Sequence, residues 1–256
     1  MEVLSDRGYF TMLIVLVHSL TFGYSFMMDI IKRNGWYTDR ILQYPREEPP
    51  DNLVNKCLIK NIRNHFIIVP FALYYCGYDA FLYMGMRTDY SSWLLVSWKC
   101  CGRDLIVSFI INDTLFYWGH RALHIPFLYK YIHKEHHQFK QPIAQASEWA
   151  HPIKDVAANI IPTLAGCFIM GSHLYILLVW IFLRMWKTLD AHCGYNFPFP
   201  LSIWRGLPGM FGSDMHDFHH ESKEGMDSCF GAMSTFWDWI CETDKAFYET
   251  KKNNKR

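Results

Sequence analysis

The chain has 256 residues, a formal net charge of +1 at pH 7, 17% aromatic residues and 19% charged residues. The even charge balance argues against a nucleic-acid-binding protein, and the aromatic content argues against an intrinsically disordered chain. A mean hydropathy of -0.03 is typical of a soluble domain. However, that mean combines long uncharged runs with polar segments, so it does not exclude a membrane protein.

Eight cysteines are present without a C-x-x-C pair, and only Cys100 and Cys101 are adjacent. This pattern disfavours both a disulfide scaffold and a cysteine-based zinc site.

The first two apolar segments cover residues 9–28 and 66–86. The first is uncharged and, at 1.5 Å per residue, long enough to cross a hydrocarbon layer of roughly 30 Å. No small-residue cleavage signature follows it, so we expect a membrane helix rather than a removed signal peptide. The second carries one charge, Asp79, and the proline-rich stretch 44–51 is predicted to connect the two.

A third, shorter apolar segment covers residues 105–119 and contains Asp113, which indicates a helix that leaves the membrane at a site. The fourth, residues 156–183, has no formal charge and stays apolar to residue 189. A single helix of this length, about 42 Å, is too long for one crossing. We therefore predict a hairpin broken at Gly171 and Ser172.

This arrangement places residues 32–63, 120–155 and 184–256 on one side of the membrane, where the histidine clusters can meet. That side carries 21 of the 25 lysines and arginines, but it is also about five times longer, so the positive-inside rule adds little. We expect an all-α integral membrane bundle of about four to five membrane segments, with a cytosolic, histidine-rich helical cap. The expected divisions are 1–103 (membrane segments and connectors), 104–248 (the histidine-bearing domain) and 249–256 (a basic tail).

Three histidine clusters stand out: HRALH (120–124), HKEHH (133–137) and HDFHH (216–220). On a helix these spacings share a face, so each cluster is expected to present a row of imidazoles to a single point. Neutral imidazole binds iron, zinc and copper. The pattern H-x-x-H-H occurs twice, whereas about 0.03 occurrences are expected by chance at this composition. A metal centre is the favoured interpretation; the alternatives are a polar surface patch or an adventitious zinc site.

Carboxylates near the clusters are better candidates for supporting groups than for ligands. Asp113 precedes His120 by two helical turns, where it could accept the other ring N–H of a metal-bound histidine. Asp190, Asp217 and Glu148 are candidates for the same role, with helix-end charge or solvation as the alternative. His151 could be a ligand, a supporting group or a packed residue, whereas packing is expected for the isolated histidines His18, His65 and His173.

Motifs for several other chemistries are missing. The sequence has no G-x-G-x-x-G, P-loop, H-E-x-x-H or G-x-S-x-G motif, and no Glu-x-x-His pair from the histidine clusters matches a carboxylate-bridged four-helix site. Reducing equivalents for any redox chemistry are therefore expected to come from a partner protein.

The clusters and their flanks resemble the membrane fatty-acid hydroxylase and sterol desaturase superfamily over residues 104–248. The segments that carry the likeness are NDTLFYWGHRALH, LYKYIHKEHHQFKQPIAQASEWAHP, LDAHCGYNFP, DMHDFHH and STFWDW. They are most similar to the C-4 methylsterol monooxygenases. Departures from that pattern lie at Cys193, at Cys229 and Phe230, and at residues 241–244, and none of them removes a histidine.

The resemblance implies an endoplasmic reticulum membrane enzyme with a non-haem di-iron centre that faces the cytosol. It also implies O2 as co-substrate and electrons from cytochrome b5 and its NAD(P)H-dependent reductase. The metal ligands that it implies are His120, His124, His133, His136, His137, His192, His216, His219 and His220. Asn196 occupies a position where some relatives have a further histidine ligand.

These expectations define a leading hypothesis: a di-iron monooxygenase that oxidises the C-4 methyl group of a sterol in successive steps. An aromatic wall for the substrate could come from Trp118, Trp180 and Trp186, although membrane packing is the alternative for each of them. Competing hypotheses are a hydroxylase of a sterol side chain or acyl lipid with the same centre, and a non-catalytic membrane metal-binding protein.

Overall fold

The structure is a computed structural model that describes residues 6–42, 47–88, 98–198, 202, 204, 207–221 and 223–253. Parts of the expected connector (44–46) and of the basic tail (254–256) lie outside these residues. The described ranges are helical, with three isolated β-bridges and no strand. The all-α prediction is therefore confirmed for this part of the chain.

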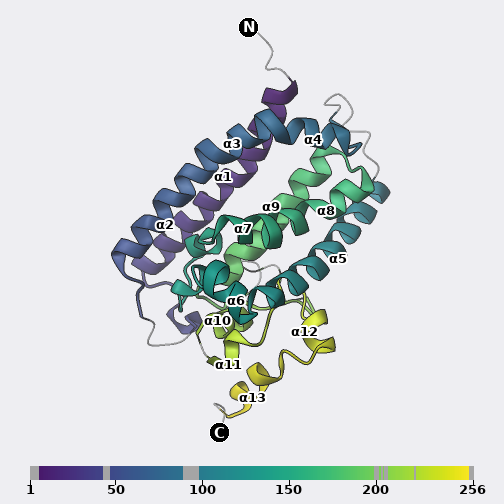
Figure 1. Cartoon of the computed structure of the whole chain (residues 1–256). Helices are drawn as coiled ribbons and strands as arrows, with labels where there is room; N and C mark the ends of the chain where they lie inside the picture. Colours follow the sequence, from purple (N-terminus) through teal and green to yellow (C-terminus); the bar gives the residue numbers. More distant parts are fainter. Residues whose placement is uncertain are drawn as a thin grey trace.

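Long helices form a bundle whose two ends differ (Figure 1). They are α1 (Asp6–Arg33), the helix that runs from α2 (Asp51–Arg63) to α4 (Tyr78–Tyr83), α5 (Trp98–Leu123), α8 (Ile161–Met170) and α9 (Leu174–His192). The N-terminus lies at one end of the bundle, and the C-terminal helices α10 (Ser213–Glu221) to α13 (Lys245–Asn253) lie at the other. The ends of α5 and α9 carry His120 and His192 to this second end, as the parity of the predicted segments required.

The second membrane helix begins earlier than expected. It starts at Asp51 rather than at residue 66, because the polar stretch before the apolar run forms the amphipathic helix α2, which buries Cys57 and Asn61. Wider π-helical turns follow, the first of them at Asn64–Ile68, just before Pro70. A proline has no N–H and clashes with the carbonyl four residues before it, which favours such a local widening. The π-helical turn Asp155–Ile160 precedes Pro162 in the same way.

The predicted hairpin in the fourth apolar region is present. Gly171 ends α8 with a φ of 54°, a left-handed conformation that suits glycine, and α9 starts three residues later. The turn is tied to the loop after α4, because Leu174 donates a backbone hydrogen bond to the carbonyl of Arg87 (2.8 Å). Both loops therefore lie at the end of the bundle away from the histidines.

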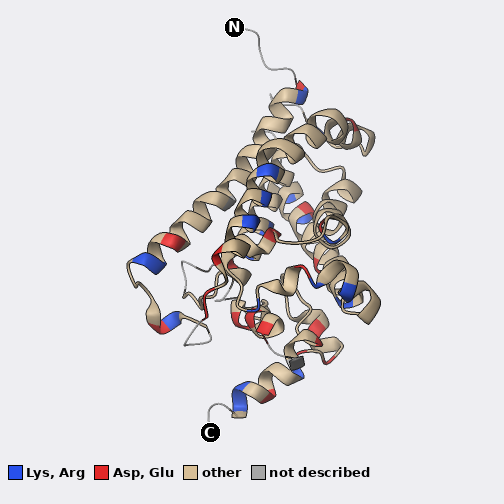
Figure 2. Cartoon of the chain, turned by 60° about the vertical axis from the view of Figure 1, so that its left-hand side comes forward, with Lys and Arg blue, Asp and Glu red and all other residues tan. Residues whose placement is uncertain are grey.

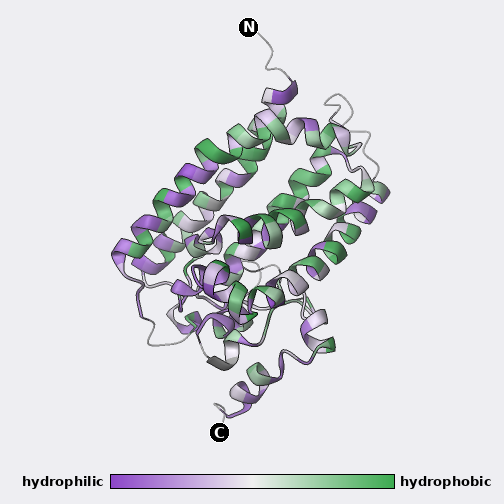
Figure 3. Ribbon diagram, viewed as in Figure 1, coloured by the Kyte–Doolittle hydropathy of each residue, from purple (hydrophilic) through white to green (hydrophobic). Residues whose placement is uncertain are grey.

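Three helices are long and apolar enough to cross a membrane: Asp6–Arg33, Asp51–Tyr83 and Pro152–Met170. Only 6% of the most apolar window of the second is buried, so most of its surface is available to lipid. The long helices are predominantly hydrophobic and the histidine end is more polar (Figure 3), and charged residues are sparse along the upper parts of the helices (Figure 2). Helices α5 and α9 are not among these three membrane-length helices, so crossings by them stay a prediction. In its second half α9 buries three charged residues, Arg184, Lys187 and Asp190.

The bundle core requires a close approach between α5 and α8. A Cβ at Gly166 of α8 would lie 2.4 Å from Ser108 Cα and 2.8 Å from Ser108 Oγ. Glycine at this position therefore lets the two backbones touch, and the neighbouring Cys167 Sγ lies 3.3 Å from the same Ser108 hydroxyl.

Replacing Gly166 with alanine is expected to destabilise the bundle. The added methyl group meets backbone that cannot move without separating the helices, and such overpacking typically costs about 1–3 kcal/mol. We expect a lower thermal midpoint for Gly166→Ala, measured by tryptophan fluorescence of the detergent-purified protein. Gly23→Ala is the matched control, because nothing lies within 4 Å of that Cβ position. Equal midpoints for the two variants would contradict the tight α5–α8 contact.

Candidate metal centre

The nine histidines predicted from the sequence lie together at the polar end of the bundle. They come from the end of α5, from the turns between Tyr129 and Gln138, from the end of α9, and from α10. Their nitrogens form two groups, and within each group the candidate ligand atoms lie within 4.8 Å of one another. The first group is His120, His124, His133, His137 and His219; the second is His136, His192, His216 and His220. Both groups are able to bind a metal ion.

The expectation that each cluster points to one place holds for HRALH, whose two histidines share the first group, and is wrong for HKEHH and HDFHH. Residues four apart share a group, as His133 and His137 or His216 and His220 do, whereas His136 and His219 belong to the other group. On α10 the reason is rotation: His219 and His220 are separated by roughly 100° around the axis. In HKEHH the backbone leaves the α-helix, since a π-helical turn ends at His133 and a 3₁₀ turn begins at His136.

Backbone carbonyls orient most of these rings. The Nδ1 atoms of five histidines each lie within hydrogen-bond distance of a carbonyl: His120 at Phe230 (2.9 Å), His136 at Trp149 (3.0 Å), His192 at Thr188 (2.7 Å), His219 at Ser228 (2.7 Å) and His220 at Phe139 (3.0 Å). A carbonyl can only accept, so Nδ1 carries the proton in each of these rings. The neutral ring then has its free lone pair on Nε2, the atom available to a metal.

The arrangement of the Nε2 atoms fits bound cations. Those of His136 and His192 lie 3.4 Å apart, yet both rings already carry their proton on Nδ1, so two lone pairs face each other. Among the described residues, the buried Nε2 atoms of His124 and His219 have no hydrogen-bond partner. A metal ion placed among these nitrogens would remove the repulsion and satisfy the unpaired acceptors.

Burial also keeps the histidines neutral. It lowers the pKa of His192 to about 3 and that of His219 to about 4. For His120, His136 and His216, burial and the neighbouring histidines hold the pKa well below its usual value. Neutral imidazole is the form that binds metal, so the environment favours the binding form near neutral pH.

The sequence suggested that Asp113 accepts the second ring N–H of His120, but the structure shows a different partner for each of these side chains. The Asp113 carboxylate instead accepts backbone N–H groups of Met233 (3.2 Å) and Ser234 (3.0 Å). The His120 Nδ1 proton goes to Phe230, on a loop 110 residues away in the sequence. That loop is held by Asp238, which accepts the N–H groups of Phe230 (2.9 Å) and Gly231 (2.8 Å). Asp238 is thus a positioning residue that the sequence analysis did not single out, although it lies in the STFWDW segment.

The other predicted supporting residues have varied surroundings. Glu148 pairs with His65, one of the histidines left to packing, and His151 caps α7 (Pro152–Lys154) by accepting the N–H of Ile153 (3.2 Å). Asp190 accepts the hydroxyl of Ser202 (2.9 Å) and, with Asn196, lines a separate small cavity. Asp217 is buried on α10. None of these side chains belongs to either histidine group, so their role in supporting the site stays a prediction.

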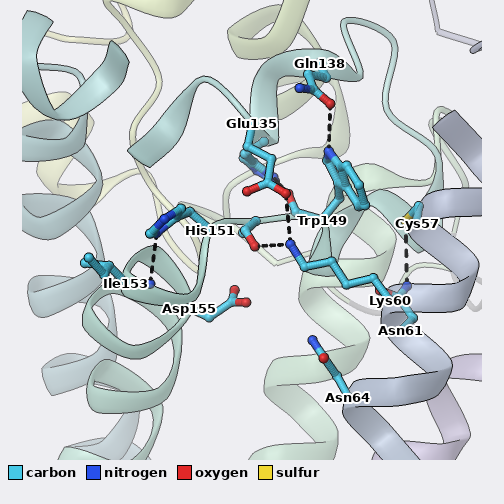
Figure 4. Close-up of polar contacts among 12 residues, drawn as sticks. Cys57, Lys60, Asn61, Asn64, Glu135, Gln138, Trp149, His151, Ile153 and Asp155 are labelled. Atoms are coloured by element: carbon cyan, nitrogen blue, oxygen red, sulfur yellow. Dashed lines mark hydrogen bonds and ion pairs between the residues drawn. The ribbon is translucent and has the colours of Figure 1, made fainter. Parts of the chain in front are cut away.

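Helix α2 anchors the carbonyl that orients His136. Figure 4 shows the Lys60 side chain reaching from α2 toward Glu135 and the 149–151 segment. Its ammonium lies 3.0 Å from Glu135 Oε1, donates to the carbonyl of Ala150 and lies 4.8 Å from the centre of the Trp149 ring. The Trp149 indole donates to Gln138 (3.2 Å). This network fixes Trp149, whose carbonyl accepts from His136.

A pocket with about 380 Å³ of empty space, part of it open to solvent, reaches both histidine groups. His120 of the first group and His136, His192 and His216 of the second contribute to its wall. The rings of Phe116 and Phe211 line it, rather than the three tryptophans expected from the sequence. Two buried cations, Lys154 and Arg184, line it as well. Neither cation was predicted from the sequence; the available signal was their position at the two ends of the uncharged run 156–183.

The depressed histidine pKa values predict an acid-sensitive metal-free protein. An unfolded histidine has a pKa near 6.5, so below that pH the unfolded chain binds protons that the folded chain cannot accept. Stability is therefore complete above about pH 6.5 and is lost as the pH falls toward the folded pKa values. At pH 5 each buried histidine would contribute a loss of about 2 kcal/mol.

We expect the thermal midpoint of chelator-treated protein to fall steeply between pH 7 and pH 5. Metal-loaded protein should lose stability at lower pH, because bound metal competes with protons. A midpoint that is the same at pH 7 and pH 5 for the metal-free protein would contradict the burial of neutral histidines.

Comparison with known proteins points to the same family as the sequence resemblance. The fatty acid hydroxylase family profile matches residues 105–243. Methylsterol monooxygenase 2-2 of Arabidopsis thaliana is 36% identical over 238 residues, which cover 92% of this chain and 86% of that protein. Very-long-chain aldehyde decarbonylase GL1-11 of Oryza sativa subsp. indica is 33% identical over 94% of this chain and 88% of its own length.

A third relative, fatty acid hydroxylase domain-containing protein 2 of Macaca fascicularis, is 38% identical over 59% of this chain and 41% of its own length. No solved structure matches. The three membrane-length helices and the similarity to these proteins make this a multi-pass membrane protein. The family profile and the near full-length relatives show that the chain belongs to the fatty acid hydroxylase family, an oxidoreductase family.

Proposed function

We propose that this protein is a membrane di-iron monooxygenase whose substrate is a sterol, with stepwise oxidation of a C-4 methyl group as the reaction. The observation that carries the proposal is the pair of histidine groups, with Nε2 atoms gathered at two points beside one cavity. Four and five ligands leave positions free on a six-coordinate ion, as an oxygen-activating iron site needs. The similarity to methylsterol monooxygenase 2-2 supports a sterol as the substrate.

The two groups would hold one iron each through the nine histidines. Bound iron would supply the activation of O2 that breaks an unactivated C–H bond, a step beyond the reach of side-chain acids and bases. In each oxidation one oxygen atom enters the substrate and the other leaves as water, with two electrons and two protons consumed. We further propose cytochrome b5 and its NAD(P)H-dependent reductase as the electron source, and an endoplasmic reticulum location with the histidine end in the cytosol.

The chain's own residues provide orientation and shielding. Backbone carbonyls and Asp238 fix the histidine rings before any metal arrives, which lowers the ordering cost of binding. Phe116 and Phe211 give the cavity an apolar wall against which a substrate carbon can rest. In this scheme residues 104–248 form the catalytic domain, residues 1–103 supply membrane helices, and residues 249–256 form a basic tail.

A second candidate is oxidation of an acyl lipid at the same centre. The relatives named very-long-chain aldehyde decarbonylases favour it, because their identity of 32–33% to this chain is close to that of the methylsterol monooxygenases. The histidine geometry is common to both candidates, so the substrate distinguishes them.

Metal content tests the ligand assignment. Protein purified anaerobically should contain about two irons per chain by elemental analysis, one for each histidine group. His192→Ala removes one of four ligands in the second group and should lower the content to about one iron per chain. His151→Ala is the control, since His151 caps α7 and belongs to neither group. Equal losses in the two variants, or zinc in place of iron in protein that stays inert with oxygen, would contradict the assignment.

Sterol profiling tests the substrate. In a yeast strain that lacks C-4 demethylation, expression of this chain should reduce the accumulated 4,4-dimethylsterols, whereas the His192→Ala variant should leave them unchanged. Continued accumulation despite good expression and full iron content would argue against C-4 oxidation. A change confined to the acyl-lipid profile would favour the second candidate.

A further inference from the structure

The cavity beside the histidines contains more positive charge than an apolar substrate needs. Lys154 is 3% exposed and Arg184 is 5% exposed, and both line the cavity together with His136 and His192. Burying a cation without an acceptor is strongly unfavourable. Two such groups that line one pocket therefore point to a ligand that compensates for their charge.

Within the described part of the chain, Lys154 and Arg184 each have N–H groups that form no hydrogen bond. The Lys154 ammonium forms no hydrogen bond or ion pair there; the nearby negative charges are Asp155, next to it in the sequence, and Glu148, whose carboxylate pairs with His65. Arg184 donates from Nε to Asn112 Oδ1 (3.3 Å), and its guanidinium lies 5.1 Å from the centre of the Phe116 ring. The negative charge near it is Asp113, whose carboxylate already accepts the N–H groups of Met233 and Ser234.

Lys187, which lies on α9 as Arg184 does, is a buried lysine whose ammonium has a hydrogen-bond acceptor. It is fully buried, but its ammonium donates to the carbonyl of Phe211, and it does not line the cavity. Lys154 and Arg184 thus differ from Lys187 because they line the pocket beside the histidines.

We propose that Lys154 and Arg184 form a carboxylate-binding subsite beside the metal centre. The remaining wall is largely uncharged, with Phe116, Phe211, Ala191 and Ala232, so the ligand is an apolar molecule that carries a carboxylate. A lysine and an arginine together supply charge-assisted hydrogen bonds to both oxygens of such a group. The histidines that share the wall place the carboxylate next to the position where oxidation would occur.

This inference rests on the proposed function for its choice of ligand. Oxidation of a methyl group passes through an alcohol and an aldehyde and ends at a carboxylic acid, which is ionised at neutral pH. The hydroxyl and carbonyl oxygens of the intermediates can accept a hydrogen bond from Lys154, and the final carboxylate can pair with both cations. A fatty acid has the same carboxylate chemistry, so the test includes it as a separate arm.

The test is equilibrium binding to the full-length, iron-loaded protein in nanodiscs under anaerobic conditions, where no turnover occurs. The ligands are a 4-carboxysterol, the matching neutral 4-methylsterol and a C18 fatty acid, and the binding of each is measured by direct titration without a sterol probe. We expect Lys154→Met to weaken binding of the 4-carboxysterol about 10- to 100-fold, and to change binding of the 4-methylsterol by less than about threefold. Because the two affinities are compared within one variant, a partial loss of folded protein cancels.

Lys187→Met is the matched control, since it removes a buried lysine that does not line the cavity. It should keep the wild-type ratio of the two affinities. The subsite is overturned if Lys154→Met weakens the binding of neither the carboxysterol nor the fatty acid relative to that of the methylsterol. Lys154-dependent binding of the fatty acid but not of the carboxysterol supports the subsite while contradicting the sterol proposal, so the two can fail separately.

Discussion

Hydrogen bonds from histidine Nδ1 atoms to backbone carbonyls determine how the rest of the site is built. Each bond turns a ring and, because a carbonyl only accepts, also fixes Nε2 as the nitrogen with the free lone pair. The carbonyls belong to distant segments: His120 uses Phe230, and His220 uses Phe139. The site therefore forms only when the C-terminal helices and the loops around residues 139–149 have closed around the ends of α5 and α9.

Two charged side chains, the buried Asp238 and the half-buried Lys60, bond to the segments that carry these carbonyls rather than to the histidines. Asp238 accepts the N–H groups on both sides of the Phe230 carbonyl, and Lys60 fixes the segment that carries the Trp149 carbonyl. Charge-assisted hydrogen bonds in a low-dielectric interior are among the stronger polar contacts. Residues on α2, in a membrane helix, and on α12 (Phe236–Ile240) thus control ring orientation without touching a metal ligand.

The sequence was sufficient for features that depend on local spacing. The eight histidines of the three clusters and the hairpin turn at Gly171 follow from residue order and helix length, whereas His192 was included because of the family resemblance. The division of the histidines between two groups was not predicted, because HKEHH departs from α-helical geometry and because His219 and His220 are roughly 100° apart around α10. The partner of His120 was predicted incorrectly because Asp113 is near in sequence, whereas Phe230 is near only in the folded chain. Lys154 and Arg184 were missed since charges at the ends of an apolar run resemble ordinary membrane-boundary residues.

The candidate ligands are all neutral, and this determines the net charge of the cavity. Nine imidazoles would contribute no negative charge to offset two divalent ions, and the buried carboxylates of Asp113 and Asp238 are already engaged by backbone N–H groups. Lys154 and Arg184 add further positive charge. On the proposed function, a substrate that gains oxygen interacts more strongly with this cavity at each step than the apolar molecule that entered it. The electrostatics therefore favour successive oxidations of one bound molecule over release after each step.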